Sequence, residues 1–555
     1  MRPLLPLIAG AVALTQQGYQ RQRVVRSATR LPQEPAELDD WLKPYAGADE
    51  FRAERQQQLA ETASDLEITF LGTASCVPSV TRGVSCTALR YDGATYLFDA
   101  GEATQVQAQR TTLVKPGKVE AIFVTHLHGD HTFGLPGLLC LCGQDRDASD
   151  QPIEIFGPEG LRAYVRASLQ LTQSRVAAPH VIHELVGVPQ RPPAGFRARA
   201  ASKLFFCSRW RVDGVKPGPG RVDGVAAAVA RSWGIDALTT RKNAGPPRGP
   251  FVSPKATGQS EAAFGEVFEG RNIPRDADGA WTCETRSKAL LVRAAPMAHT
   301  VPCVGFVVVE PDRPGALDVD KVAPILERNI DALKAKGIKE PRRLYRVIKE
   351  MGADQQFTFP DGAVIRRDDV VGPDKRGRVL VFCGDTADAS SLLPLLPSRG
   401  ADVVVHEATN CRVEPFDNDV SEEEVERSSV SHGHSTPQLA GRFAALAGAE
   451  RLVLNHFSPR YKGDASPAAL AVMAKLEDAA RSTFGGEVVA AWDLLNLPVA
   501  AKDEASAASA SADAARLEAG ADAADAFRRG EIAAQAPRKK APPRLKKKPP
   551  ASKVR

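Results

Sequence analysis

The residues VEAIFVTHLHGDH, from Val119 to His131, join an apolar run to a dense group of possible metal ligands. The first half is short and apolar, which predicts a buried β-strand that leads directly into the histidines. The second half, HLHGDH, holds four ligand-type side chains within six residues, and Gly129 allows the turn that lets them converge. Imidazole and carboxylate groups together suit Zn²⁺. The segment therefore predicts a zinc site at the carboxyl end of a strand.

Short apolar strands that end on or just before His, Asp or Glu recur along the chain, and helical stretches such as 436–447 alternate with them. Besides the strand at 119–125, the predicted strands are 66–70, 87–90, 95–98, 379–382, 403–405 and 452–454. This pattern predicts an α/β layered architecture, with helices covering the sheets and the site at the strand ends.

Six residues cannot complete two coordination shells, so further ligands are expected at other strand ends. His299, Asp385 and His456 each follow closely after such an apolar run. Taken singly, His299 could equally be a hydrogen-bonded core histidine, and Asp385 could be a helix N-cap in Gly-Asp-Thr. The number and placement of the ligand types together favour the metal interpretation.

Longer motifs surround these residues in a definite order. They are LGTAS (71–75), FDAGEATQ (98–105), THLHGDHTFGLPGLL (125–139), GDT (384–386), HEAT (406–409), GHST (433–436) and NHFSPRY (455–461). Together they resemble the ribonuclease Z family of the metallo-β-lactamase superfamily, over about residues 68–497. HEAT, HST and HFSPRY are more specific than the histidine loop, which the whole superfamily shares. Where the family has Pro-x-Lys-x-Arg-Asn, this chain keeps only Pro78 and Arg82.

The resemblance implies an α/β fold, the αββα sandwich of the metallo-β-lactamases. It also implies a zinc-dependent endoribonuclease that removes 3′ trailers from precursor tRNA, leaving a tRNA 3′-OH and a 5′-phosphorylated trailer. Two Zn²⁺ ions per chain would be bridged by Asp385. The implied ligands are His126, His128, His299 and Asp385 for one ion, and Asp130, His131, Asp385 and His456 for the other. Asp99 would orient a ligand imidazole through its other ring nitrogen.

Catalytic roles follow from the same resemblance and from the chemistry of phosphate esters. With two zinc ions activating a water for attack on phosphorus, Asp130 would orient that water and accept its proton. His434 would protonate the leaving O3′, and Glu407 would hold His434 in its cationic form. Arg82 and Arg460 are candidate phosphate contacts, with an ordinary surface salt bridge as the alternative for each.

Composition divides the chain into three parts. Residues 1–64 are predicted to be an N-terminal targeting or leader region, 65–499 the catalytic domain, and 500–555 an Ala-rich linker with a basic tail. Within the catalytic domain, about 190–280 is a low-complexity insertion rich in Pro, Gly and Arg, which is expected to be disordered. The segment at about 310–362 resembles the tRNA-binding arm of the family. Its alternative is an amphipathic helical hairpin packed on the core.

Composition also limits partners and location. The 555 residues are 43% apolar with a net charge of +5, which allows a sizeable core but gives no global charge argument for nucleic acid. Nine cysteines without a C-x-x-C pair indicate a reducing compartment. A basic, acid-free start predicts a plastid or mitochondrion, with nucleus or cytoplasm as the alternative. We expect no membrane partner, because the apolar run at the start is too short for a span. The sequence shows no second copy of the fold, which predicts the short form of the family and hence a homodimer.

Three other functions compete with this prediction. Another hydrolase of the same fold, such as an arylsulfatase or a cyclic-nucleotide phosphodiesterase, would use the same ligands. The HEAT and HST motifs and the arm-like segment favour tRNA over it. A non-catalytic RNA-binding subunit would have lost ligands, whereas all of them are present. A persulfide or nitric-oxide enzyme would need a partner domain that the sequence lacks.

Overall fold

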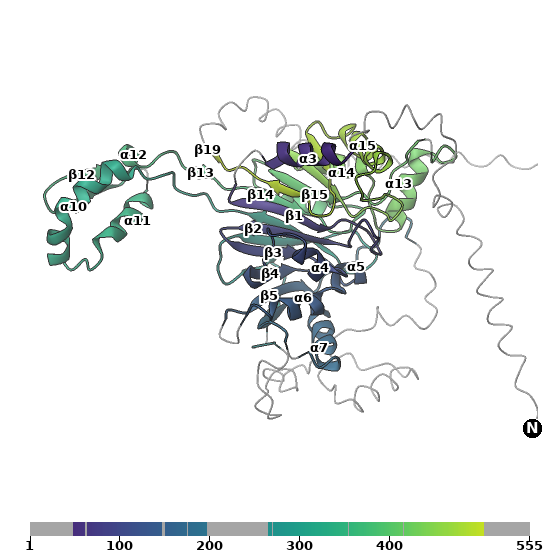
Figure 1. Cartoon of the computed structure of the whole chain (residues 1–555), viewed down its shortest axis with the longest axis horizontal. Helices are drawn as coiled ribbons and strands as arrows, with labels where there is room; N and C mark the ends of the chain where they lie inside the picture. Colours follow the sequence, from purple (N-terminus) through teal and green to yellow (C-terminus); the bar gives the residue numbers. More distant parts are fainter. Residues whose placement is uncertain are drawn as a thin grey trace, which may run out of the picture.

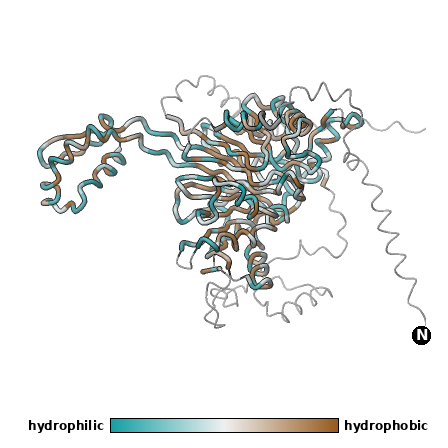
Figure 2. The backbone as a smooth tube through the Cα atoms, in the orientation of Figure 1, coloured by the Kyte–Doolittle hydropathy of each residue, from teal (hydrophilic) through white to brown (hydrophobic). Residues whose placement is uncertain are grey.

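The computed structural model describes residues 48–60, 64–146, 150–174, 176–196, 265–268, 270–352, 354–414 and 416–503. Two β-sheets lie face to face in this part of the chain, and helices cover their outer faces (Figure 1). Apolar residues are concentrated in the strands of the two sheets (Figure 2).

The first sheet has eight strands in the order β18-β1-β2-β3-β4-β5-β6-β7. Its strands are β1 (Leu66–Gly72), β2 (Cys86–Tyr91), β3 (Ala94–Phe98), β4 (Val119–Phe123), β5 (Ile153–Pro158), β6 (His180–Leu185), β7 (Asn272–Ile273) and β18 (Asn496–Pro498). Pairing is antiparallel from β18 to β3 and parallel from β3 to β7.

The second sheet has seven strands in the order β17-β16-β15-β14-β10-β9-β8. Its strands are β8 (Trp281–Thr282), β9 (Leu291–Pro296), β10 (Val304–Val309), β14 (Val379–Phe382), β15 (Val403–Glu407), β16 (Arg451–Asn455) and β17 (Glu487–Ala490). The four strands β14 to β17 are parallel, so their carboxyl ends meet at one edge.

Helices close both outer faces of the sandwich. They are α3 (Ala48–Ala60), α4 (Thr104–Gln109), α5 (Gly129–Thr132), α6 (Leu135–Cys142), α7 (Leu161–Leu171), α13 (Glu422–Ser431), α14 (Pro437–Leu446) and α15 (Pro467–Arg481), with 3₁₀ turns η3 (Pro116–Lys118) and η8 (Ser390–Leu395). None of the helices described between residues 48 and 503 has both the length and the apolar character of a bilayer span.

The core has three layers because side chains alternate along each strand. In β14, Leu380 and Phe382 face the first sheet, whereas Val379 and Val381 face the helices α14 and α15. Phe382 stacks on Phe98 of the first sheet with ring centroids 3.8 Å apart. The outer face of the first sheet packs on α6 and α7 in the same way. The αββα sandwich expected from the sequence is therefore confirmed.

Both ends of the catalytic domain lie further out than predicted. Helix α3 belongs to the folded domain, because Arg52 donates to the carbonyls of Gly463 and Asp464, at 2.9 and 2.8 Å. The predicted leader 1–64 is therefore wrong for residues 48–60. At the other end, β19 (Lys502–Asp503) pairs with β13 (Lys375–Arg376), which extends the domain past residue 499. The predicted targeting residues and basic tail lie outside the described residues.

The predicted insertion at about 190–280 is also too long at its carboxyl end. Strand β7 pairs with β6, and Trp281 at the start of β8 is fully buried. Glu266 forms a buried two-point ion pair with Arg166, at 2.6 and 2.7 Å. The chain from residue 265 onward is thus part of the sandwich, and residues 197–264 lie outside the described residues.

The segment between β10 and β14 projects away from the sandwich as an arm (Figure 1). It contains α10 (Val319–Ala335), η7 (Pro341–Arg343), α11 (Leu344–Lys349), β11 (Gln356–Thr358), β12 (Val364–Arg366) and α12 (Arg367–Val370). The arm has its own apolar cluster, which includes Val322, Leu326 and Ile348. Two antiparallel bridges, Arg313 with Lys375 and Leu317 with Val371, join its two connecting chains. It is a projecting unit and not a hairpin packed on the core, and it extends past the predicted end at residue 362.

Candidate metal centre

The HLHGDH loop follows β4 and places four candidate ligands at the edge where the parallel strands end. Asp385 follows β14 and His456 follows β16, so these strands end at the same place. A Cβ atom on Gly129 would lie 2.2 Å from the ring of Phe133, so a side chain here would require that exposed ring to move.

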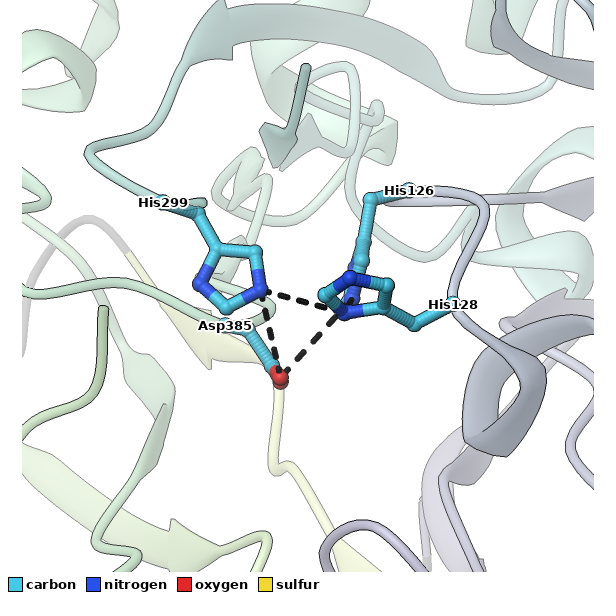
Figure 3. Close-up of side chains that lie close together, drawn as sticks. All are labelled: His126, His128, His299 and Asp385. Atoms are coloured by element: carbon cyan, nitrogen blue, oxygen red, sulfur yellow. Dashed lines mark hydrogen bonds and ion pairs between the residues drawn. The ribbon is translucent and has the colours of Figure 1, made fainter. Parts of the chain in front are cut away.

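The first group of candidate ligands consists of His126, His128, His299 and Asp385, whose ligand atoms all lie within 4.8 Å of one another (Figure 3). His128 Nδ1 is 3.0 Å from His126 Nε2 and 3.3 Å from His299 Nε2. Asp385 Oδ2 lies 3.8 Å from His126 Nε2 and 3.9 Å from His299 Nε2.

The second group consists of Asp130, His131, Asp385 and His456. It uses the other oxygen of the shared carboxylate: Asp385 Oδ1 is 3.3 Å from His131 Nε2 and 3.1 Å from His456 Nε2. Asp130 Oδ2 lies 3.4 Å from His456 Nε2. Because one oxygen of Asp385 faces each group, the geometry fits the bridging position that the sequence predicts for it.

Hydrogen bonds at the far side of the His131 and His299 imidazoles leave their inner nitrogens free to bind a metal. His131 Nδ1 donates to Asp99 Oδ2 at 2.7 Å, and His299 Nδ1 donates to the Gly433 carbonyl at 2.8 Å. Asp99 is itself fixed by Thr125, whose backbone N–H donates to its Oδ1 at 2.7 Å. Asp99 thus contacts the outer nitrogen of His131, and its orienting role stays a prediction.

The electrostatics of the cluster also fit metal ions. Burial would raise the pKa of Asp385, but the charges of His456 and His131 hold it well below its usual range. Asp385 Oδ1 is nevertheless a buried oxygen without a hydrogen-bond donor among the described residues. Burial lowers the pKa of His126 well below its usual value and that of His299 to about 4, so both favour the neutral form that a metal ligand needs. The buried Asp385 carboxylate, beside the neutral imidazoles of His126 and His299, calls for positive charge, which metal ions would supply.

His434 and Glu407 form a pair beside the two groups. His434 Nδ1 is 3.2 Å from each carboxylate oxygen of Glu407 and 3.8 Å from Asp385 Oδ2. Burial opposes protonation, but the Glu407 carboxylate raises the pKa of His434 to about 9. The ion pair therefore keeps His434 cationic at neutral pH, as an acid requires.

The two arginines predicted to contact phosphate have different surroundings. Arg82 is 1% exposed and donates to Thr73 Oγ1 at 2.6 Å and to the Tyr461 carbonyl at 3.0 Å. It has no open path to a substrate, so the predicted phosphate contact is wrong for Arg82 in this structure. Arg460 is partly exposed and makes a two-point ion pair with Asp417, at 2.8 and 2.7 Å. Its phosphate contact stays a prediction.

Sequence reasoning missed several supporting groups. The backbone N–H of Cys76 donates to Asp130 Oδ2 at 2.6 Å. The hydroxyl of Thr409 bonds to Glu407 Oε2 and lies 3.1 Å from His456 Nδ1, which links the acid pair to a candidate ligand. Thr409 lies in the HEAT motif and could have been inferred from it. Cys76 contributes only backbone, which no side-chain pattern indicates.

Known proteins resemble this chain over most of its length. The model of the metallo-beta-lactamase superfamily matches residues 80–142. Zinc phosphodiesterase ELAC protein 1 of Bos taurus is 32% identical over 408 residues, which are 73% of this chain and 89% of that protein. Ribonuclease Z of Bacillus velezensis is 28% identical over 439 residues, 78% of this chain and 99% of that protein. The crystal structure of the short form of human tRNase Z is 25% identical, covers 78% of this chain and 99% of its own, and has a TM-score of 0.41. Identity at the level of the bovine protein, across most of both sequences, means that the chain belongs to the family of ELAC zinc phosphodiesterases and ribonucleases Z, hydrolytic nucleases of the metallo-beta-lactamase superfamily.

Proposed function

We propose that this chain is a zinc-dependent endoribonuclease that removes 3′ trailers from tRNA precursors, leaving a tRNA 3′-OH and a 5′-phosphorylated trailer. The observation that carries the proposal is the pair of four-residue groups sharing Asp385, with the His434–Glu407 ion pair beside them. Two ligand groups and one cationic acid are the parts that phosphodiester hydrolysis requires.

The residues of the chain divide the work between them. When bound, two zinc ions would supply an activated water and neutralise the charge that builds on the phosphate. Asp130 orients the attacking water and accepts its proton. His434 donates a proton to the leaving O3′, and Glu407 keeps His434 protonated between turnovers. Asp99 holds the ring of His131 in place.

The arm supports precursor tRNA as the substrate. Around the turn from α10 to η7, the basic residues Lys334, Lys336, Lys339, Arg342 and Arg343 are all exposed. Arg343 pairs with Glu340. A projecting surface with these basic residues fits the phosphate backbone of folded RNA. We therefore propose that the arm holds the tRNA elbow while the trailer enters the metal centre.

The proposal is tested by cleavage of a 3′-extended precursor tRNA. Purified protein is incubated with this RNA, with and without a chelator, and with zinc added back, and the new ends are mapped. We expect one cut after the tRNA body, with a 3′-OH and a 5′-phosphate, that stops with the chelator and returns with zinc. Turnover of sulfate esters or cyclic nucleotides without cleavage of the precursor would instead assign the chain to another hydrolase activity of the same fold.

Two finer points belong to the same proposal. We propose a homodimer, because the described residues form one catalytic domain with one arm and one metal centre; light scattering of the purified protein would measure its mass.

We also propose an organellar location, which rests on the basic, acid-free start of the sequence. A reporter fused behind residues 1–47 should enter plastids or mitochondria, and a reporter that stays in the cytoplasm or nucleus would contradict this location.

A further inference from the structure

We infer that Arg82 is a buried clamp that sets the geometry of the second ligand group, and that it is a positioning residue and not a substrate contact. This inference rests on the proposed two-metal centre. Arg82 is among the largest fully buried side chains of the described chain, although it is a cation. A guanidinium at such a position needs partners for its donors, and those partners identify what it holds.

The oxygen acceptors of Arg82 lie in three separate segments, and Nη2 also contacts the sulfur of Met473 in α15 at 3.3 Å. Nη1 donates to Thr73 Oγ1 at 2.6 Å and to the Ala491 carbonyl at 3.1 Å. Nε and Nη2 donate to the carbonyls of Tyr461 and Lys462, at 3.0 and 3.3 Å. The guanidinium also lies over the ring of Phe457, 4.7 Å from its centroid. One side chain thus joins the LGTAS turn, the end of β17 and the HFSPRY loop.

The two loops that Arg82 joins also pair with each other. Phe457 donates its N–H to the Thr73 carbonyl, and Ser75 donates its N–H to the Phe457 carbonyl, both at 2.8 Å. Each loop positions one member of the second group. His456 directly precedes Phe457 and has a left-handed φ of 56°, and Cys76 donates its N–H to Asp130. A shift of either loop therefore moves Asp130 or His456.

The first ligand group has no such dependence. His126 and His128 come from the loop after β4, and His299 comes from the turn between β9 and β10. His299 is held by the Gly433 carbonyl, and the contacts of Arg82 reach none of these segments. Loss of the clamp should therefore weaken the second metal position much more than the first.

The space around Arg82 is shaped to fit it. A Cβ atom on Gly463 would lie 2.3 Å from Arg82 Cγ, so only glycine leaves room for the side chain. Thr73, which accepts from Arg82, donates in turn to Asp493 Oδ1 at 2.7 Å. Asp493 also accepts the N–H of Gly83, next to Arg82, at 2.6 Å. Asp493 thus holds both Thr73, which accepts from Arg82, and Gly83, which follows Arg82 in the chain.

The test compares metal content and kinetics of Arg82→Met and Arg82→Lys with a matched control, Arg162→Met. Arg162 is a similarly buried arginine that donates to main-chain carbonyls of β6 and residue 270 and also pairs with Glu184, away from the centre. Zinc per chain is measured by elemental analysis after dialysis, and thermal unfolding shows that each variant is folded. Zinc binding is then titrated, and kcat and KM are measured on precursor tRNA.

We expect two zinc ions per chain in the wild-type protein and in Arg162→Met, but one in Arg82→Met. Loss of a direct hydrogen-bond partner of a metal ligand lowers metal affinity by about 10- to 100-fold, and loss of Arg82, which acts through the two loops, should cost no more than this. The titration should show this loss at one position only, with kcat reduced, KM little changed, and activity restored by excess zinc. Arg82→Lys should lie between the wild type and Arg82→Met, because lysine keeps the charge but loses the fork of donors.

Two results would overturn the clamp. Full zinc content with a raised KM would make Arg82 a phosphate contact after all, and equal zinc loss in Arg162→Met would reduce the effect to general destabilisation. If Arg82→Met does not fold, Thr73→Val removes the hydroxyl that accepts from Arg82 and donates to Asp493, and it should show the same selective zinc loss; an unchanged zinc content in it would count against the inference. The wild-type measurement stands apart: a wild-type protein without zinc would contradict the proposed function itself.

Discussion

Replacing His434 with alanine separates protonation of the leaving group from activation of the attacking water. His434 is not needed to complete either four-residue ligand group, so the variant should keep its zinc and bind precursor tRNA. A positioned acid contributes about 10²- to 10⁴-fold to rate, which corresponds to about 2.7–5.4 kcal/mol of barrier. Glu407→Gln should cost less. It weakens one charge-assisted interaction, at 3.2 Å from both oxygens, which is worth about 1.5–3 kcal/mol or roughly 10- to 100-fold.

The assay uses two substrates that differ in their leaving group. Precursor tRNA leaves through an alkoxide that needs a proton, whereas a nitrophenyl phosphodiester leaves as a stable phenolate. Both variants should therefore recover most of their activity on the nitrophenyl substrate, while Asp130→Ala should stay impaired on both. Equal damage by His434→Ala on the two substrates, or zinc loss from that variant, would refute the acid role.

Three further predictions follow from other contacts. Asp385→Ala should lower both zinc content and activity, because its two oxygens face different ligand groups; full metal content by elemental analysis would contradict the bridge. Glu266→Gln should cost about 3–5 kcal/mol in urea unfolding, because it leaves the buried charge of Arg166 without its partner, whereas deletion of 197–264 should cost far less. Burial lowers the pKa of His180, so below about pH 6.5 the unfolded chain binds a proton at His180 that the folded protein does not bind. The free energy of unfolding should therefore decrease as the pH is lowered, by up to about 1.4 kcal/mol per pH unit. His180→Phe should reduce this slope when unfolding is measured at pH 7.5 and 5.5.

The layered fold and the convergence of the ligands could be predicted because both depend on local patterns. The apolar run from Ala121 to Val124 has no polar interruption, and the structure has β4 at Val119–Phe123, within two residues of the strand predicted at 119–125. Parallel strands bring their carboxyl ends to one edge, so residues placed just after such strands meet there. His126, Asp385 and His456 follow this rule, and they lie together as the spacing indicates.

The errors concern residues whose role is set by distant partners. Arg82 lies in a polar loop that reads as surface, and its burial depends on carbonyls at 461, 462 and 491 that no local pattern reveals. Helix α3 belongs to the domain because Arg52 meets residues 463 and 464, more than 400 positions away. Glu266 lies in a stretch with the composition of the insertion, and its pairing with Arg166 and its bridge to His180 show that the sheet has resumed.

The arm closes its own apolar cluster, and two connecting chains join it to the sandwich. A change in its length or in the charges at its tip therefore leaves the packing of both sheets unaltered. The metal centre tolerates little variation, because Asp130, His131, His299 and His456 each lie at hydrogen-bond distance from a further residue that holds them. Selection can thus act on the two parts at different rates, so that descendants of one ancestor share a cleavage reaction while they diverge in the RNA shapes that they hold.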